Sequence, residues 1–302
     1  MKYRKCIIIM IFGLLSVMLF SCEDETLWQE DASIEGHSMF IVGGAEAWME
    51  SAIALRTSQC DPSGPNDLIC SGLLISPTAV LTASHCVDLA VTSGACPNGI
   101  DPSQWTTFRV AVGCHNALNC PASNWKPLAS APVTHPDYDI AILKLASPVT
   151  NVQSRRLATP ARQSEVKAGD WVTLYGYGLT AETGYTSDVL RSVERPISTI
   201  PLERIGIMHP TPHLFDTLCE SNPYIGANHG DSGGPTLVYR DGEWFSLGVM
   251  NGGGYGSAQT DHILVPYFYN WIESNVSDLP RQYLLPSAQI GSANAAMLAT
   301  II

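Results

Sequence analysis

The sequence predicts an all-β protein built from antiparallel strands, arranged as a sandwich or a barrel. Short runs of β-prone residues alternate with clusters of turn residues along most of the chain, a spacing that does not suit βαβ units. The composition agrees, because the 302 residues include 25 glycines, 20 prolines and 7 tryptophans. Glycine and proline mark turns, so their abundance favours many short strands over a helical bundle.

The predicted strands are separated by clusters of Gly, Pro, Asn and Asp. They are residues 52–56, 69–75, 79–82, 107–112, 140–145, 171–177, 189–199, 235–238, 244–250 and 262–265. One helix is predicted over 265–276, because Val265, Phe268, Ile272 and Val276 repeat at helical spacing. Residues 58–67, 93–104 and 114–124 are rich in Cys, Pro, Ser and Asn, and we expect loops there.

The N-terminus predicts export. Basic residues begin the chain, and the apolar run 7–20 that follows is too short to span a bilayer as a helix. The run ends in Leu-Phe-Ser-Cys, which resembles the lipobox of bacterial lipoproteins, where Cys22 would become the acylated first residue. An ordinary signal peptide cleaved near Ser21 is the alternative. We expect a signal peptide at 1–21 and an exported protein, either extracellular or anchored in the cell envelope.

Charge and cysteine content narrow the class of partner. The net charge is −12 and no long Lys/Arg run follows the N-terminus, so we expect neither nucleic acid nor an anionic membrane surface as a partner.

Nine cysteines occur without a CxxC pair or zinc-type Cys/His spacing, so we expect disulfides and no metal. Residues 22–40 are acidic and polar, as expected of a tether or propeptide, and 278–302 form a C-terminal tail.

The segment Gly-Asp-Ser-Gly-Gly-Pro at 230–235 carries the clearest chemical signal. Glycines allow a tight turn and close approach of a substrate backbone to Ser232. A serine hydroxyl is a weak nucleophile alone, so catalysis needs a base, an acid to orient it, and donors for developing negative charge. His85 is the candidate base and Asp139 the candidate acid, with Asp137 as a rival. A plain surface turn is the alternative, because these are ordinary turn residues.

Together these segments resemble the trypsin-like, chymotrypsin-fold serine proteases over residues 41–276. Four motifs stand in the family's order: IVGG at 41–44, TASHC at 82–86, DIAIL at 139–143 and GDSGGP at 230–235. Gly-Tyr-Gly at 176–178 is similar to the family's Gly-Trp-Gly. The resemblance implies two six-stranded antiparallel β-barrels with the active site in the cleft between them, plus a C-terminal helix, in a domain at 41–277. It implies no cofactor.

The resemblance also implies the roles of the site residues. Ser232 would be the nucleophile, His85 the general base and then acid, and Asp139 the carboxylate that orients the imidazole. The N–H groups of Gly230 and Ser232 would form the oxyanion hole. Gly-Tyr-Gly departs from the family pattern at Tyr177.

A zymogen switch is implied as well. Cleavage before Ile41 would free an ammonium group that pairs with Asp231, so the uncut chain would be poorly active. The preceding residue is Phe40 rather than Arg or Lys, so the activator should prefer a large apolar residue, and self-cleavage is a hypothesis. No cysteine lies within 23–40, so no disulfide can retain the propeptide. If Cys22 is lipidated, activation would release the domain from the membrane.

The expected specificity is apolar rather than basic. Gly226 lies six residues before Ser232, where relatives that cut after Arg or Lys carry an aspartate, so a basic side chain would find no counter-charge. Asn251 and Gly253 stand where contacts with the substrate backbone are expected. Asn228 replaces a cysteine that usually links the pocket rim to the following glycine-rich loop, which leaves the shape of the pocket open.

Disulfides are also implied. Cys70 and Cys86 match the family's disulfide beside the histidine, whereas Cys219 matches a family cysteine whose usual partner is not visible. Four cysteines allow three pairings; the pairs expected from loop proximity are Cys114–Cys120 and Cys60–Cys96.

We therefore expect a monomeric serine endopeptidase that cleaves proteins or peptides through an acyl-enzyme. A catalytically inactive relative that serves as a binding or adhesion module is the alternative, with Ser84 and Tyr177 as its only mild support. A third reading, acyl transfer to a non-peptide ester, would use the same residues.

Overall fold

The computed structural model describes residues 41, 44–59, 68–88, 101–180, 188–204, 211–218, 225–253 and 258–280. Several predictions fall outside this part of the chain, namely the signal peptide, Cys22, the tether, Phe40, the tail beyond 280, and the pairing of Cys60, Cys96 and Cys219. No helix among the described residues is long and apolar enough to cross a membrane.

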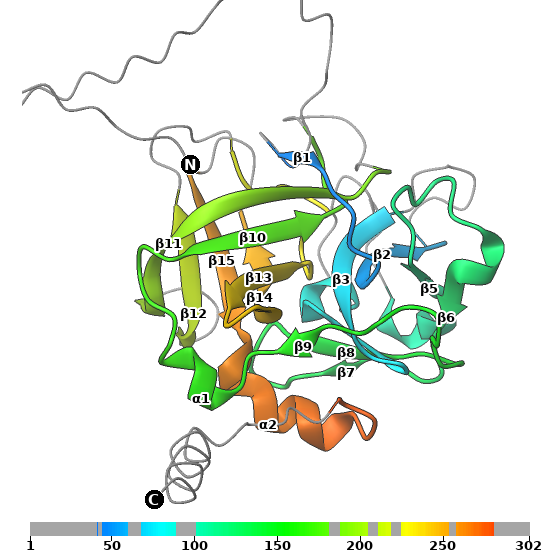
Figure 1. The fold of residues 1–302 in the computed structure, drawn as a ribbon. Coiled ribbons are helices and arrows are strands. Elements are labelled where there is room, and N and C mark those ends of the chain that lie inside the picture. The colour runs from blue at the N-terminus through cyan, green and yellow to red at the C-terminus, as the bar shows by residue number, and fades with distance from the viewer. Residues whose placement is uncertain are drawn as a thin grey trace, which may run out of the picture. The chain divides into compact units, whose positions relative to one another are not determined.

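The first of two antiparallel sheets has the strand order β6-β5-β2-β3-β4-β8-β7 (Figure 1). Its strands are β2 (Ala52–Thr57), β3 (Leu68–Ser76), β4 (Ala79–Thr82), β5 (Phe108–Val112), β6 (Trp125–Pro127), β7 (Val133–Thr134) and β8 (Ala141–Lys144). The sheet curls until the chain after β6 meets β8. There Ala129 N–H donates to the Lys144 carbonyl at 2.8 Å and Ala146 N–H donates to the Pro127 carbonyl at 3.0 Å.

The second sheet follows the order β1-β11-β10-β13-β14-β15-β12, and pairing of β11 with β12 closes six of its strands into a barrel. Its strands are β1 (Ala45–Glu46), β9 (Arg156–Leu157), β10 (Trp171–Gly176), β11 (Arg191–Arg204), β12 (Thr211–Leu218), β13 (Pro235–Arg240), β14 (Glu243–Gly252) and β15 (Gln259–Leu264). The short strand β9 pairs in parallel with β14. The α-helices of the described residues are the single turn α1 (Pro160–Gln163) and α2 (Val265–Asn275), and Ser84–Cys86, Pro102–Thr107 and Ala122–Asn124 form short 3-10 helices.

The all-β architecture with a C-terminal helix is therefore confirmed. One barrel is closed by continuous strand pairing, and the other is a curled sheet whose edges meet only briefly, so the two barrels are less alike than expected. The sequence analysis did not predict strand β12. It contains Pro212 and Asp216, which disfavour a strand locally, and its pairing with β11 and β15 on either side overrides that preference.

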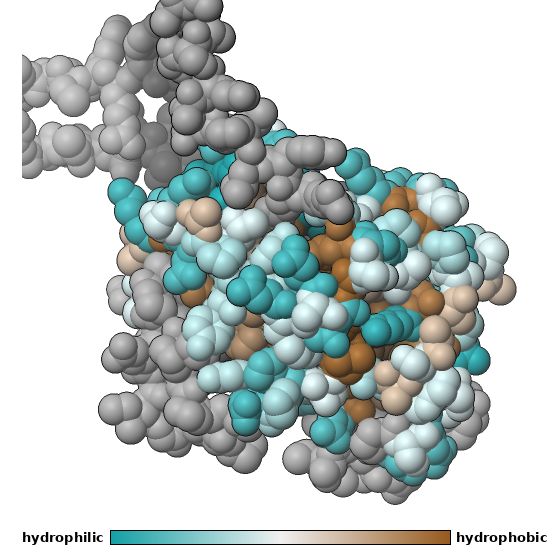
Figure 2. Space-filling view, turned by 90° about the horizontal axis from the view of Figure 1, so that it is seen from below, coloured by the Kyte–Doolittle hydropathy of each residue, from teal (hydrophilic) through white to brown (hydrophobic). Residues whose placement is uncertain are grey.

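Apolar side chains join the two sheets. Leu237, Val249 and Ile263 belong to the second sheet but pack into the core cluster of the first. Helix α2 adds Phe268 and Ile272 to the same cluster and lies beneath both sheets in Figure 1. Viewed from below, apolar patches lie among polar residues on this face (Figure 2). This junction fixes the relative position of the segments that build the site.

Candidate active site

A pocket of about 290 Å³ gathers residues from both sheets. Four residues that the sequence predicts for the site, His85, Ser232, Asn251 and Gly253, lie in its wall. The complete lining is His85, Ala227, Asn228, His229, Ser232, Met250, Asn251, Gly252 and Gly253. Residues far apart in the sequence thus meet in one cavity.

His85 and Asp139 contact each other directly. His85 lies in the 3-10 turn Ser84–Cys86 after β4, and Asp139 lies just before β8, which pairs with β4. The imidazole Nδ1 is 2.6 Å from Asp139 Oδ2, and the backbone N–H of His85 donates to Oδ1 at 2.8 Å. The Ser84 hydroxyl donates to the same Oδ1 at 2.8 Å. Asp137, the rival acid, is exposed and makes no contact with His85.

The surroundings of Asp139 favour its ionised form. Burial alone would raise the pKa of this carboxyl, but hydrogen bonds from His85 and Ser84 and the charge of a protonated imidazole outweigh it. The pKa of Asp139 therefore lies below its usual value. An ionised carboxylate at Nδ1 places the imidazole proton there and leaves Nε2 available as a base.

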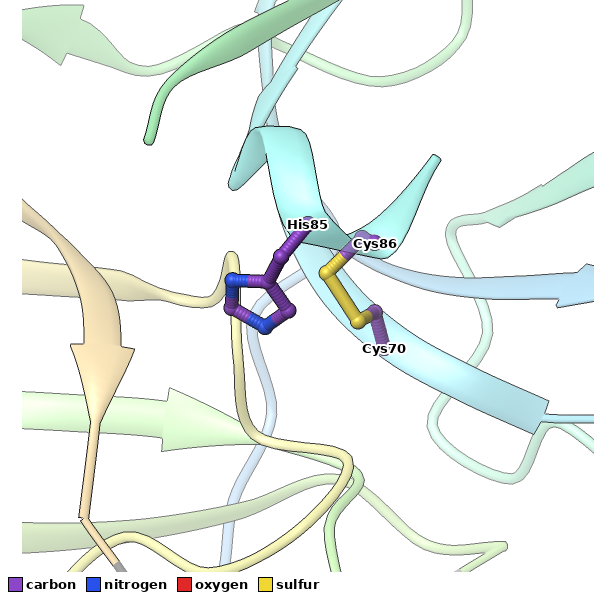
Figure 3. Close-up of side chains that lie close together, drawn as sticks. All are labelled: Cys70, His85 and Cys86. Atoms are coloured by element: carbon purple, nitrogen blue, oxygen red, sulfur yellow. A yellow bond between two sulfur atoms is a disulfide. The ribbon is translucent and has the colours of Figure 1, made fainter. Parts of the chain in front are cut away.

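A disulfide anchors the turn that carries the histidine. Cys86 is bonded to Cys70 of β3 with an S–S distance of 2.03 Å, as Figure 3 shows beside the His85 ring. The two sulfurs and an imidazole nitrogen lie within 4.8 Å of one another, a spacing that would suit a metal ion. Because both sulfurs are in the disulfide, neither is a thiolate, and these residues do not form a metal-ligand set.

Ser71 positions the segment that contains Ser232. Its backbone N–H donates to the Ser232 carbonyl at 2.9 Å. Its hydroxyl donates to the Gly230 carbonyl at 2.9 Å and accepts from the Tyr177 N–H at 2.9 Å. The sequence analysis did not predict a role for Ser71. The feature that could have indicated one is its position directly after Cys70, which the expected disulfide places beside the turn of His85.

The backbone around Ser232 presents two N–H groups without partners. Within the described part of the chain, the N–H groups of Gly230 and Ser232 donate to no acceptor, whereas Asp231 N–H donates to the Asn228 carbonyl. Gly230 has φ +93°, a left-handed conformation that glycine adopts at little cost. Among these same residues, no hydrogen bond joins the Ser232 hydroxyl to His85. Such contacts commonly shorten only when substrate binds.

Asp231, the residue before Ser232, is fully buried. Its carboxylate accepts from the N–H of Gly178 and from the N–H of Asn228, each at 2.8 Å. Burial, only partly offset by these two bonds, raises its pKa to about 7. A Cβ on Gly176 or Gly178 would overlap the carboxyl group, which explains the two glycines of the Gly-Tyr-Gly segment. None of the residues that the structure describes forms an ion pair with Asp231.

Tyr177 is buried, and its phenol donates to the Cys114 carbonyl at 2.5 Å. Burial raises the pKa of this phenol far above its usual value. Cys114 is itself bonded to Cys120. Tyrosine in place of tryptophan therefore links the second sheet to a loop of the first.

Gly226 does not line the pocket. It lies next to Ala227, which does, and against the guanidinium of Arg195 on β11. Arg195 is fully buried and was not singled out from the sequence. Nothing in its local pattern separates it from the other charged residues of its strand.

Comparisons with known proteins agree with the motifs. The Trypsin family model matches residues 41–272. Brachyurin of Leptuca pugilator is 31% identical over 260 residues, which cover 80% of this chain and 100% of that protein. Granzyme-like protein 1 of Rattus norvegicus is 27% identical over 247 residues, covering 78% and 91% respectively. The suppressor of tumorigenicity 14 protein homolog of Bos taurus is 29% identical over 225 residues; these cover 69% of this chain but only 25% of that protein.

Proposed function

Because the chain belongs to the trypsin family of serine proteases, we propose that it is an exported serine endopeptidase that cleaves proteins or peptides through an acyl-enzyme. The observation that carries the proposal is the 2.6 Å contact between His85 Nδ1 and Asp139, in a pocket that Ser232 also lines. A base held by a carboxylate and a serine hydroxyl within one cavity are the parts that acyl transfer needs.

In the proposed first step, His85 Nε2 takes the proton of the Ser232 hydroxyl as its oxygen attacks the substrate carbonyl. Asp139 stabilises the imidazolium that forms, and Ser84 helps to hold Asp139 in place. The N–H groups of Gly230 and Ser232 receive the negative charge that develops on the carbonyl oxygen. His85 then protonates the departing amine. Water repeats the sequence on the acyl-enzyme and frees the second product.

Activation by cleavage before Ile41 is part of the proposal. The two N–H donors to Asp231 leave its carboxylate buried without a positive charge from the described residues, and the pKa of about 7 reflects that cost. An ammonium group at Ile41 would supply the missing charge. Because Asp231 precedes the nucleophile, its ion pair would fix the backbone of the oxyanion hole.

The proposed pocket rejects basic side chains. Gly226 offers no counter-charge, and the neighbouring wall contains Ala227 and Met250, so an apolar side chain is accommodated.

Export and release complete the proposal. Two disulfides suit an oxidising compartment outside the cytosol. We expect a monomer whose only link to a membrane is a lipid on Cys22. Cleavage before Ile41 would then release the domain, and fully active Ile41-terminated enzyme recovered in washed membranes would contradict this part.

The test uses enzyme that begins at Ile41, with the Ser232→Ala variant as the matched control. A fluorophosphonate probe reports a reactive serine, and a peptide library reports hydrolysis. We expect labelling and cleavage by the native enzyme, neither by the variant, and much lower activity in the uncut chain. Binding of peptides without cleavage, together with no labelling, would favour the inactive binding module instead.

A further inference from the structure

A second cavity lies on the first sheet, separate from the active-site pocket. Its volume is about 420 Å³, and it shares no lining residue with the pocket of His85 and Ser232. Its wall contains Arg56 of β2, Arg109 of β5 and Trp125 of β6, three strands that lie side by side (Figure 1). A cavity of this size is large enough to take part of a ligand out of water.

Arg56 and Arg109 are directly opposite each other. Their Cα atoms are partners in the antiparallel pairing of β2 with β5, so both side chains leave the same face of the sheet. The residues on either side of Arg109, Phe108 and Val110, are buried in the core, so the arginines are on the outer face. Like charges at directly opposite positions destabilise a sheet. Strand pairing alone therefore gives no reason for two arginines here.

Neither of these arginines has an acidic partner among the residues that the structure describes. Other surface arginines of this acidic chain do form ion pairs. These are Arg156 with Glu243 at 2.8 Å, Arg162 with Asp241 at 3.0 Å and Arg240 with Asp170 at 2.6 Å. The positive charge of Arg56 and Arg109 is therefore available to a ligand.

Contacts within the sheet already hold both guanidinium groups in place. Arg56 lies over the indole ring of Trp125, with its Cζ 3.9 Å from the ring centroid. Arg109 Nη1 donates to the carbonyls of Thr106 and Phe108 at 2.6 and 2.7 Å. A guanidinium has more N–H donors than these contacts use, so both arginines keep donors for a further acceptor. Because the groups are already ordered, binding costs less conformational entropy.

The rest of the wall is mainly apolar. Leu68 pairs with Arg56 from the other neighbouring strand, and Leu118, in the loop after β5, is 54% exposed. Asp188 is the one acidic side chain that the described residues contribute to the wall. Within this same part of the chain it forms no ion pair with either arginine, and burial raises its pKa, which disfavours its charged form. The cavity thus combines two cations with apolar surface.

Strand β3 connects this cavity to the active site. Leu68 begins β3, and Cys70 follows two residues later, about 7 Å along the strand. Cys70 is bonded to Cys86 in the turn of His85, with 6.0 Å between the two Cα atoms. The two sites are therefore close enough for one protein substrate to contact both.

We propose that this cavity is a second substrate-binding site, which takes an acidic segment of a protein substrate outside the residues that enter the active-site pocket. The proposal rests on the peptidase function above and deepens it. Planar guanidinium groups match the two oxygens of a carboxylate, so Arg56 and Arg109 would hold an acidic side chain. Leu68, Leu118 and Trp125 suit an apolar side chain next to it.

The first experiment measures binding without cleavage, in the chain that carries Ser232→Ala. Fluorescence anisotropy compares a labelled peptide that has two glutamates between leucines with its glutamine counterpart. We expect the glutamate peptide to bind at least about tenfold more tightly, because glutamine loses the charge-assisted hydrogen bonds. Its affinity should also fall as salt is added.

Variants locate the binding site. Arg109→Gln and Leu118→Asp should each weaken binding of the glutamate peptide by about tenfold. Arg156→Gln, on β9 of the second sheet, changes the net charge by the same amount as Arg109→Gln and should leave binding unchanged. Leu118 is exposed, so Leu118→Asp decides the question even where Arg109→Gln fails to fold.

The second experiment uses enzyme that begins at Ile41 and two substrates with the same cleaved sequence. One of them is extended through a flexible linker by the glutamate segment. We expect the extension to lower KM by about tenfold and to leave kcat unchanged, because it adds binding away from the reacting bond. Arg109→Gln should cancel the difference between the two substrates.

Each outcome separates the second site from the peptidase function. Equal binding of the glutamate and glutamine peptides, or native affinity in a folded Leu118→Asp variant, would overturn the site, since arginines that only cover the sheet do not distinguish the two peptides. Glutamate binding with no decrease in KM would refute its role toward the substrate. An enzyme that neither reacts with a fluorophosphonate nor cleaves peptides, but still binds the glutamate peptide, would contradict the peptidase function and leave an acidic-peptide site.

Discussion

The hydroxyl of Ser71 donates a hydrogen bond of 2.9 Å to the carbonyl of Gly230, across a separation of 159 residues and from one sheet to the other. Its backbone N–H holds the Ser232 carbonyl at the same distance. The segment that contains Ser232 is therefore bonded to β3, the strand whose Cys70 is linked to the turn of His85. The two sheets are positioned not only by apolar packing but also by polar contacts at the candidate active site.

Replacing Ser71 by alanine should disturb catalysis more than folding. The variant leaves the Gly230 carbonyl and the Tyr177 N–H without their buried partner, which should lower the free energy of unfolding by about 1–3 kcal/mol. Because the peptide plane of Gly230 is then less fixed, we expect kcat to fall roughly tenfold with little change in KM. Steady-state kinetics and urea denaturation measure both. Ser164→Ala, on the exposed turn after α1, is the control, and an equal effect there would contradict the argument.

Replacing Ser84 by alanine should make stability less dependent on pH. The pKa of Asp139 is lowered in the folded state, so its contribution to stability is present above its unfolded value of 3.8 and is lost as pH falls through the folded value. Removing the Ser84 hydroxyl removes one of the hydrogen bonds that lower the pKa of Asp139, so the contribution of ionised Asp139 to stability decreases. We expect the variant to be less stable than the native chain by about 1–2 kcal/mol at pH 7, with the difference becoming smaller as pH falls and Asp139 takes up a proton. Urea denaturation at pH 7 and at acidic pH tests this, and a difference independent of pH would count against it.

Replacing Gly178 by alanine should abolish the activated state. A Cβ there would overlap the carboxyl group of Asp231 and its backbone nitrogen. The Asp231 carboxyl group and backbone nitrogen are buried and have no room to shift, so the chain segment before Ser232 must move. We therefore expect activity to fall by at least about a hundredfold. Gly169→Ala is the matched control, since nothing lies within 4 Å of its Cβ and only its φ of +90° is strained. It should keep its activity per active site, which fluorophosphonate titration and peptide hydrolysis measure.

Much of the fold could be predicted because its signals are local. Most strands are short β-prone runs between turn residues, and α2 begins where the spacing of Val265 and Phe268 predicts it. Strands β1, β6, β7 and β9 were not predicted because each has only two or three residues, and β12 was not predicted because it depends partly on pairing with β15, which is distant in the sequence.

The residues of the candidate site also fall into those that a local motif predicts and those that only the folded structure reveals. His85, Asp139 and Ser232 stand in sequence motifs, whereas Ser71 and Arg195 act through contacts with residues that only the folded chain brings near. Arg195 resembles any strand arginine until β12 and β15 surround it. Gly226 could be placed by counting from Ser232, but its contact with the Arg195 guanidinium could not be found that way.

Asp231 should make the stability of the uncut chain depend on pH in a way that the activated enzyme does not show. In the uncut chain burial raises its pKa to about 7, against an ordinary value of 3.8. Between these values the folded state holds a proton that the unfolded state releases, so the free energy of unfolding decreases as pH rises from about 4 to about 7. The difference corresponds to roughly 4 kcal/mol at most. Cleavage before Ile41 adds an ammonium group that favours the ionised carboxylate and should remove this decline.

The Asp231→Asn variant separates the two states, because its side chain does not titrate. In the uncut chain it should flatten the stability profile between pH 4 and pH 7, as measured by urea denaturation of chains that also carry Ser232→Ala to prevent self-cleavage. In enzyme cut before Ile41 it should reduce kcat/KM by at least about a hundredfold, because the ammonium group loses its partner and the oxyanion hole its support. Asp137→Asn, an exposed acid two residues from Asp139, is the control in both experiments. A native stability profile that stays flat from pH 4 to pH 7, or full activity of the cut Asp231→Asn enzyme, would refute the proposed switch.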